Sequence, residues 1–262
     1  MLEMVSEGKS RQYGFTLEGD YAFQAGGQVS AAYTWNRTEE NTPYNGNNAI
    51  SALNTRVQGD PRELEWAPAS NDFRHKVVLR GSLPEVFGFQ LSGSYVGISG
   101  APINVVVNRD IMGTSTSGDE LAFIFDPDDP ATPANVAEGM RTVLANADDN
   151  FADYLRDNLG SRAERNALNN PFSGQLNLRL SREFPLPTGQ RVDVMFDIFN
   201  VMNIFNNEWG ATSRFSTNQT LLNVTGFDQD TQQYEYRVNE NFGQVNRSGT
   251  PYQIQLGARL RF

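Results

Sequence analysis

The sequence has 262 residues, of which 39% are hydrophobic, and 31 acidic against 21 basic side chains give a net charge of -10. The acidic balance argues against a nucleic-acid-binding protein, because such proteins carry clustered positive charge. The absence of cysteine excludes disulfides and thiolate metal sites. No apolar run reaches about 18 residues, so the sequence predicts no transmembrane helix.

Apolar and polar residues alternate in seven stretches, a pattern typical of β-strands with one apolar and one polar face. The stretches span residues 11–24, 28–38, 72–82, 89–99, 172–184, 191–200 and 251–262. Each has about ten residues or slightly more, which is enough for a tilted strand to cross a bilayer. The alternation is complete in the last stretch, PYQIQLGARLRF.

The connections between these stretches alternate in length. Short turns follow the first, third and fifth stretches, and long polar segments follow the others, at roughly 39–70, 104–170 and 203–249. Short periplasmic turns and long extracellular loops are typical of barrels in the outer membrane. We therefore predict an all-β fold in the cell outer membrane: an antiparallel up-and-down transmembrane β-barrel segment of about seven strands with long extracellular loops, one partly helical.

Two loops carry patterns of their own. Helical spacing after Thr132 predicts one or two short surface helices, with Thr132 and Pro133 as cap and first turn, a break near NADDN and a stop at Gly160. The stretch LLNVTGFDQDTQQYEYRV predicts a hairpin above the membrane. The following loop aromatics are predicted either to contact a ligand or to stabilise their own loops: Tyr44, Phe123, Phe125, Phe151, Tyr154, Trp209 and Phe227.

Alternation alone leaves open which face is inside, because a soluble lipocalin-like barrel has its apolar face inward. Charges of both signs on the polar face predict a wet lumen: Glu18, Asp20, Arg74, Lys76, Arg80, Arg179, Asp193, Asp197, Arg259 and Arg261. Aromatics near the strand ends predict two interfacial girdles. Tyr13, Trp35, Phe73 and Phe172 belong to the loop side, and Phe23, Phe89 and Phe184 to the turn side. A soluble β-barrel or sandwich that binds a ligand remains the alternative.

The sequence gives little support for chemistry. His75 is the only histidine, and it falls on an apolar strand face, where packing is expected. Asp193 and Asp197 lie about 13 Å apart along one strand, too far for a catalytic pair, and should meet Arg179 or other bases across strands. The acidic stretches FDPDDP and NADDN lack the spacing of an EF-hand loop. We expect no catalytic residue, no metal site and no cofactor.

Four segments resemble the C-terminal part of TonB-dependent outer-membrane receptors, particularly the branch with an N-terminal carboxypeptidase-regulatory-like domain. They are NDFRHKVVLRGSL, ERNALNNPFSGQLNLRLSREFPL, VDVMFDIFNVMNIFN and YQIQLGARLRF. The resemblance implies a barrel of about 22 strands, closed by a plug, that imports a nutrient ligand with energy from the TonB complex. Residues 1–262 would then be the C-terminal portion of the barrel, with the plug domain and signal peptide absent and the TonB complex reached only through the missing plug.

An odd number of strands suits such a portion, since bacterial barrels take an even number of at least about eight. The alternative is part of a passive porin-like or adhesin barrel. The final strand resembles the signal that the barrel assembly machinery recognises, carried by Tyr252, Leu256, Ala258, Leu260 and Phe262; a plain edge strand is the other interpretation. Expected partners are outer-membrane lipid, that machinery and an unknown small nutrient ligand, and not nucleic acid.

Overall fold

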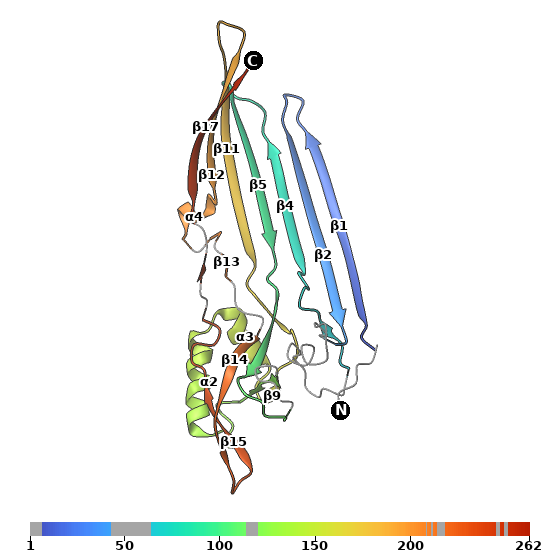
Figure 1. The fold of residues 1–262 in the computed structure, drawn as a ribbon, viewed down its shortest axis with the longest axis vertical. Helices are drawn as coiled ribbons and strands as arrows, with labels where there is room; N and C mark the ends of the chain where they lie inside the picture. The colour runs from blue at the N-terminus through green and yellow to red at the C-terminus, as the bar shows by residue number, and fades with distance from the viewer. Residues whose placement is uncertain are drawn as a thin grey trace.

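Seven long strands form one antiparallel sheet in the computed structural model, which describes residues 7–42, 64–113, 120–207, 209–210, 212–213, 218–244, 247–248 and 251–262. Their order is β1-β2-β4-β5-β11-β12-β17, with the short β3 beside β2 (Figure 1). The bounds are β1 Ser10–Ala22, β2 Gln28–Glu40, β3 Ala67–Pro68, β4 His75–Ser82, β5 Phe89–Ile98, β11 Ser173–Pro185, β12 Arg191–Phe199 and β17 Gln253–Arg261. Neighbours in the sheet follow chain order, which confirms the up-and-down topology and the seven predicted strands.

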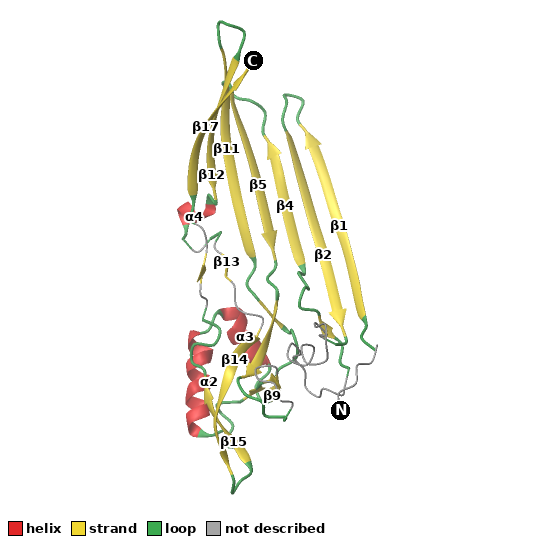
Figure 2. Cartoon of the chain, viewed as in Figure 1, coloured by secondary structure: helices red, strands yellow, loops and turns green. Residues whose placement is uncertain are grey.

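The two ends of the sheet differ. One end carries the short turns, and the β1–β2 turn has Gly26 and Gly27 at a φ of 86°, a left-handed conformation that favours glycine. At the other end the long connections gather, and Figure 2 shows the helices α2 (Ala134–Asn146) and α3 (Asp149–Asp157) there. The predicted division into a turn side and a loop side is confirmed.

The long connections after β5 and β12 fold together into a compact unit, which we call the loop lobe. Its sheet has the order β10-β6-β14-β15 with β7 beside β6, and α2, α3 and the pair β8–β9 belong to it. The bounds are β6 Pro102–Val107, β7 Glu120–Leu121, β8 Phe123–Ile124, β9 Ser161–Arg162, β10 Leu168–Asn169, β14 Asn218–Asp228 and β15 Gln233–Val238. The short α4 (Met202–Phe205) and the pair β13 (Thr212–Ser213) and β16 (Arg247–Ser248) lie in the connections from the sheet.

The hydrophobic core of the described chain lies in the loop lobe. Its fully buried members include Ile103, Val105, Met140, Val143, Phe151, Leu155, Leu221 and Phe242. The two helices lie where the sequence predicts them, and each packs its apolar face against the lobe core while its other face stays exposed. The predicted cap is wrong: Thr132 donates its hydroxyl to the Asp126 carbonyl at 2.7 Å, Pro133 precedes α2, and α3 ends at Asp157, before Gly160.

The lobe sheet joins the two loops in a way that the sequence does not predict. The hairpin of β14 and β15 is confirmed, but β14 also pairs in parallel with β6, so that Asn218 lies opposite Asn104. Every residue of β6 is buried. In the long sheet, by contrast, apolar side chains stand in the open, and Leu17 on β1 and Leu256 on β17 are 70% and 75% exposed. Among the described residues, no helix combines the length and hydropathy that a membrane crossing requires.

Candidate functional site

One face of the long sheet carries all ten residues that the sequence predicts for the lumen. They are Glu18, Asp20, Lys76, Arg80, Arg179, Asp193, Asp197, Arg259 and Arg261 within strands, and Arg74 one residue before β4. The register places Arg179 opposite Asp197 and Asp193 opposite Arg259. These residues therefore form one polar face, and its assignment to a lumen stays a prediction.

Asp197 and Arg179 form a two-point ion pair across β12 and β11. Arg179 Nε donates to Asp197 Oδ1 at 2.5 Å, and Nη2 donates to Oδ2 at 3.0 Å. Asp197 is only 6% exposed, whereas half of the Arg179 side chain is in contact with solvent. The expected cross-strand pairing is confirmed, and it holds this carboxylate in an ion pair rather than beside Asp193.

Ion pairs at the turn end link β17, β12 and β11. Arg261 of β17 reaches Asp193 of β12 at 2.6 Å and Glu183 of β11 at 3.9 Å, and Arg191 reaches the same Glu183 at 2.9 Å. Glu183 is not among the residues that the sequence predicts for the polar face. Its position, four residues after Arg179 on the same strand face, is the signal that would have found it.

A second polar cluster lies at the loop end of β1 and β2. Glu39 accepts from Arg11 at 2.6 Å and from Arg37 at 2.6 Å and 2.9 Å. Asp72, only 1% exposed, accepts the Thr38 amide at 2.8 Å and pairs with Arg74. These contacts fix the loop ends of β1, β2 and β4.

Arg165 and Asn166 tie the loop lobe to the long sheet. Arg165 is buried, and its Nη2 donates to the carbonyls of Glu40 at 2.8 Å and Glu65 at 3.0 Å, while its Nη1 reaches the Glu40 carboxylate at 3.3 Å. Asn166 donates its amide to Asn104 at 2.7 Å and its side chain to the Pro68 carbonyl at 2.8 Å. Because these buried groups make their hydrogen bonds across the boundary, they hold the lobe against the loop end of the long sheet.

Five aromatic rings form a row on the loop lobe, which we call the aromatic strip. Phe123 contacts Phe125 with ring centroids 5.0 Å apart, Phe125 contacts Tyr236 at 5.8 Å, Tyr236 contacts Tyr234 at 6.5 Å, and Tyr234 contacts Phe227 at 5.2 Å. Phe123 and Phe227 at the two ends are exposed. Burial raises the pKa of Tyr236, so this phenol stays protonated and can donate a hydrogen bond.

The predicted loop aromatics thus divide into two groups. Phe123, Phe125 and Phe227 belong to the strip, in which Phe123 and Phe227 are exposed and Phe125 packs against the lobe core, whereas Phe151 is part of that core and Tyr154 packs against it. Trp209 is exposed. Tyr44 lies outside the described residues.

Comparison with known proteins identifies the family of the chain. A family model described as outer membrane beta barrel domain matches residues 1–255. The chain belongs to this family. It is therefore a protein of the outer membrane, and the long strands are its transmembrane segments. Neither a curated protein nor a solved structure matches the chain.

The other face of this outer-membrane sheet is apolar and ends in aromatics. Tyr13, Trp35, Phe73 and Phe172 lie at the loop ends of their strands, and Phe23, Phe89 and Phe184 lie at the turn ends. His75 is also on this face, where its Nδ1 and the Tyr33 hydroxyl are 2.8 Å apart and the two rings stack. The expectation that His75 packs against a neighbour is confirmed.

The last strand of the outer-membrane sheet is among the most exposed. Tyr252, Leu256, Ala258, Leu260 and Phe262 form one apolar row, and Phe262 is 96% exposed. Across the part of the chain that the structure describes, no group of three or more His, Cys, Asp or Glu side chains could hold a metal ion. That the protein is not an enzyme and uses no cofactor stays a prediction.

Proposed function

We propose that this chain forms part of the barrel of a TonB-dependent receptor that takes up a nutrient ligand. The observation that carries the proposal is the ordered loop lobe, which has its own core and is tied by Arg165 to the loop end of a charged sheet face. A passive pore needs no such structure at its mouth, whereas a receptor needs a shaped extracellular surface. The segments that resemble these receptors span the same strands.

In this proposal the apolar face meets lipid and the polar face lines a lumen, because outer-membrane barrels have an apolar outer band and a polar interior. β1 and β17 lie at the two edges of the sheet. Unpaired strand edges cannot face lipid, so additional strands would close the barrel. Energy from the TonB complex would arrive through a plug domain outside residues 1–262.

The ligand would meet the loop lobe first, and the aromatic strip is the surface that we propose for this contact. Aromatic rings offer large contact areas at a low cost in side-chain entropy. No bond would be made or broken in the ligand, so the protein acts as a transporter rather than an enzyme.

Uptake assays test the proposal. Labelled ferric chelates, cobalamin, saccharides and peptides are offered to cells with and without this gene, each in a TonB-proficient and a TonB-deficient strain. Receptor function gives uptake of one of these ligands that requires both the gene and TonB. Uptake that requires the gene but not TonB would instead support the alternative of a passive porin-like barrel, which belongs to the same general class of outer-membrane barrel.

We further propose that the apolar row of β17 is read by the barrel assembly machinery. Phe262 is almost fully exposed and has no role in a core. Phe262→Ala in the full-length protein should therefore lower the amount assembled in the outer membrane and leave ligand affinity unchanged. Unchanged surface levels, measured by protease accessibility on whole cells, would contradict this role.

A further inference from the structure

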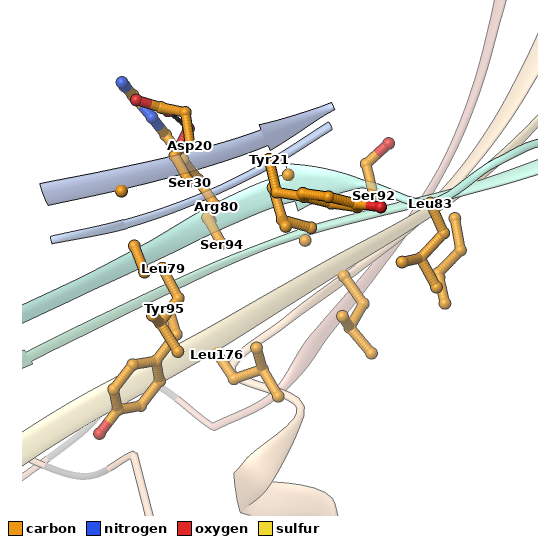
Figure 3. Close-up of a pocket in the computed structure, with 17 residues that line it drawn as sticks. Asp20, Tyr21, Ser30, Leu79, Arg80, Leu83, Ser92, Ser94, Tyr95 and Leu176 are labelled. Carbon is orange, nitrogen blue, oxygen red and sulfur yellow. Dashed lines mark hydrogen bonds between the residues drawn. The ribbon is translucent and has the colours of Figure 1, made fainter. Parts of the chain in front are cut away.

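A shallow groove runs across the apolar face of the long sheet, from β1 to β11. Figure 3 shows Leu79, Tyr95 and Leu176 on one side of it and Leu83 on the other. Its volume is about 680 Å³, within the range of about 300–1,000 Å³ common for ligand sites. The groove therefore could hold a ligand, although it lies on the outer wall of the barrel rather than in the lumen.

Glycines form the floor of the groove. Gly19, Gly81 and Gly93 line it, with leucines on its flanks. A Cβ at Gly81 would meet Val29 and one at Gly93 would meet Leu178, so neighbouring residues already cover these two positions. A Cβ at Gly19 would have no atom within 4 Å, so this part of the groove is empty. Tyr95 leans away toward the loop end, where its ring covers the backbone of Gly174.

A single arginine stands on the apolar face beside this groove. Arg182 continues the row of Leu178 and Leu180 on β11 and lies opposite Phe89 of β5. Its guanidinium carbon is 4.7 Å from the Phe89 ring centroid and 5.0 Å from that of Phe184. Among the described residues, it has no carboxylate partner within ion-pair distance, in contrast to Arg179 on the polar face.

The backbone of the β4–β5 turn makes room for this guanidinium. Gly88 has a φ of 80°, and a Cβ there would come within 3.3 Å of Arg182 Nε. The preceding Phe87 also has a positive φ, 52°, and is 91% exposed.

A cation on the lipid face is costly near the middle of a bilayer and nearly neutral at its interface. Arg182 lies at the turn end, between two girdle aromatics, and that is the depth of lipid headgroups on the periplasmic side. A guanidinium matches the geometry of a phosphate and binds it through two parallel hydrogen bonds. The groove begins at Leu91, two residues, or about 7 Å, along β5 from Phe89.

We propose that Arg182 and the groove together bind one glycerophospholipid of the periplasmic leaflet. Its phosphate lies on the Arg182 guanidinium, and one acyl chain lies over Gly93 and Gly81 toward Gly19. The phospholipid is the one occupant that offers both an anion at this depth and an apolar chain. The inference rests on the proposed orientation of the two faces.

The test is native mass spectrometry of the full-length protein, purified from outer membranes in detergent and titrated with phosphatidylglycerol or with diacylglycerol, which lacks the phosphate. Arg182→Gln should weaken phosphatidylglycerol binding about tenfold, the size expected for loss of a charge-assisted contact, and leave diacylglycerol binding unchanged. Gly19→Val fills the open end of the groove without a clash and should weaken both lipids roughly threefold. Equal phosphatidylglycerol binding by wild type and Arg182→Gln would overturn the proposal.

Arg259→Gln is the matched control. Arg259 follows Ala258, which lies in the same cross-strand row as Arg182 and Val194, so the control removes a charge at the same depth from the opposite face. It should leave lipid binding unchanged. If Arg259→Gln weakens lipid binding as much as Arg182→Gln, the effect is one of net charge and the proposed site is wrong.

A separate measurement distinguishes failure of the site from failure of the proposed orientation. Trp35 lies on the apolar face at the loop-side girdle. In vesicles of brominated phospholipid, its fluorescence should be quenched, and Trp35→Phe should remove that quenched component. If Trp35 is quenched but lipid binding does not depend on Arg182, only the lipid site is wrong. If Trp35 is not quenched, the proposed orientation of the two faces is wrong as well.

Discussion

The loop lobe and the long sheet differ in the burial of their apolar residues. In the lobe, β6 is buried at every position and Phe151 and Leu155 are fully enclosed. In the long sheet, Leu17 and Leu256 are mostly exposed, although the strands are longer and just as regular. One region builds a core and the other builds a surface.

The difference shows where each region obtains its stability. The lobe gains free energy by removing apolar area from water, as a soluble domain does. Within the part of the chain that the structure describes, no second layer covers the apolar face of the long sheet. In the orientation that we propose, the membrane supplies the apolar environment, while ladder hydrogen bonds and polar-face ion pairs hold the strands together. The two regions should therefore respond differently to the same kind of substitution.

The largest expected effect follows removal of a core ring in the lobe. Phe151 is fully buried against Phe242, with ring centroids 5.8 Å apart. Phe151→Ala should destabilise the lobe by about 3–5 kcal/mol through lost burial and the cavity left behind. Hydrogen exchange of the protein in detergent should show faster exchange in β6 and β14, with β1 to β5 unchanged.

Leu17→Ala is the control for this comparison, because Leu17 is an apolar residue of the other region. It should change stability by less than about 0.5 kcal/mol in detergent, as expected at an exposed site. Equal acceleration of exchange in the lobe and in the long sheet after Phe151→Ala would show that the two regions unfold as one unit.

A charge on the exposed apolar face should have the next largest effect. Leu17→Arg places a guanidinium near the middle of β1, where insertion against lipid costs about 2–4 kcal/mol. The folded fraction in phospholipid vesicles, read as the heat-modifiable band on a gel, should fall. Glu18→Arg introduces the same side chain one residue away on the polar face and should be tolerated. The opposite outcome would assign lipid to the polar face.

Loss of the buried carboxylate on the polar face should have a smaller effect. Asp197→Asn removes the charge that Arg179 pairs with, and a cost of about 1–2 kcal/mol is expected because half of Arg179 is already solvated. The midpoint of urea unfolding in detergent measures it. Asp20→Asn is the control, since Asp20 is exposed and accepts a hydrogen bond from the Ser30 hydroxyl. An equal loss there would remove any special role for the ion pair.

The long sheet could be predicted from the sequence because its signal is local. Each strand alternates on its own, and the predicted stretch 89–99 differs from β5 by one residue. The lobe could not be predicted to the same degree. The run PINVVV has no alternation, and its partner in β14 follows more than a hundred residues later, so no local pattern joins them.

The candidate site divides in the same way. Membership of the polar face follows from alternation, which places Asp193 and Asp197 correctly. The ion-pair partners of these carboxylates do not follow from alternation. Arg259 lies directly opposite Asp193, but Arg261 forms the ion pair with it. Arg182 is missed for another reason. It interrupts an apolar row, and a single charge within such a row is easily counted with the polar face next to it.

The smallest expected effect concerns the exposed tip of the lobe hairpin. Asp228 accepts hydrogen bonds from the Thr231 hydroxyl and from the amides of Asp230 and Thr231, and these hold the pKa of its carboxyl below the ordinary value. A depressed folded-state pKa stabilises the turn above the unfolded pKa, and this contribution is lost as the pH falls through the folded value. Amide exchange at Asp230 and Thr231 should therefore rise on acidification through that range, beyond the intrinsic change. Asp228→Asn should abolish the pH dependence, and the lobe core around Phe151 should not share it. A core that loosened over the same pH range would mean that the tip and the core are coupled, and that the lobe is less independent of its surface charges than its buried packing indicates.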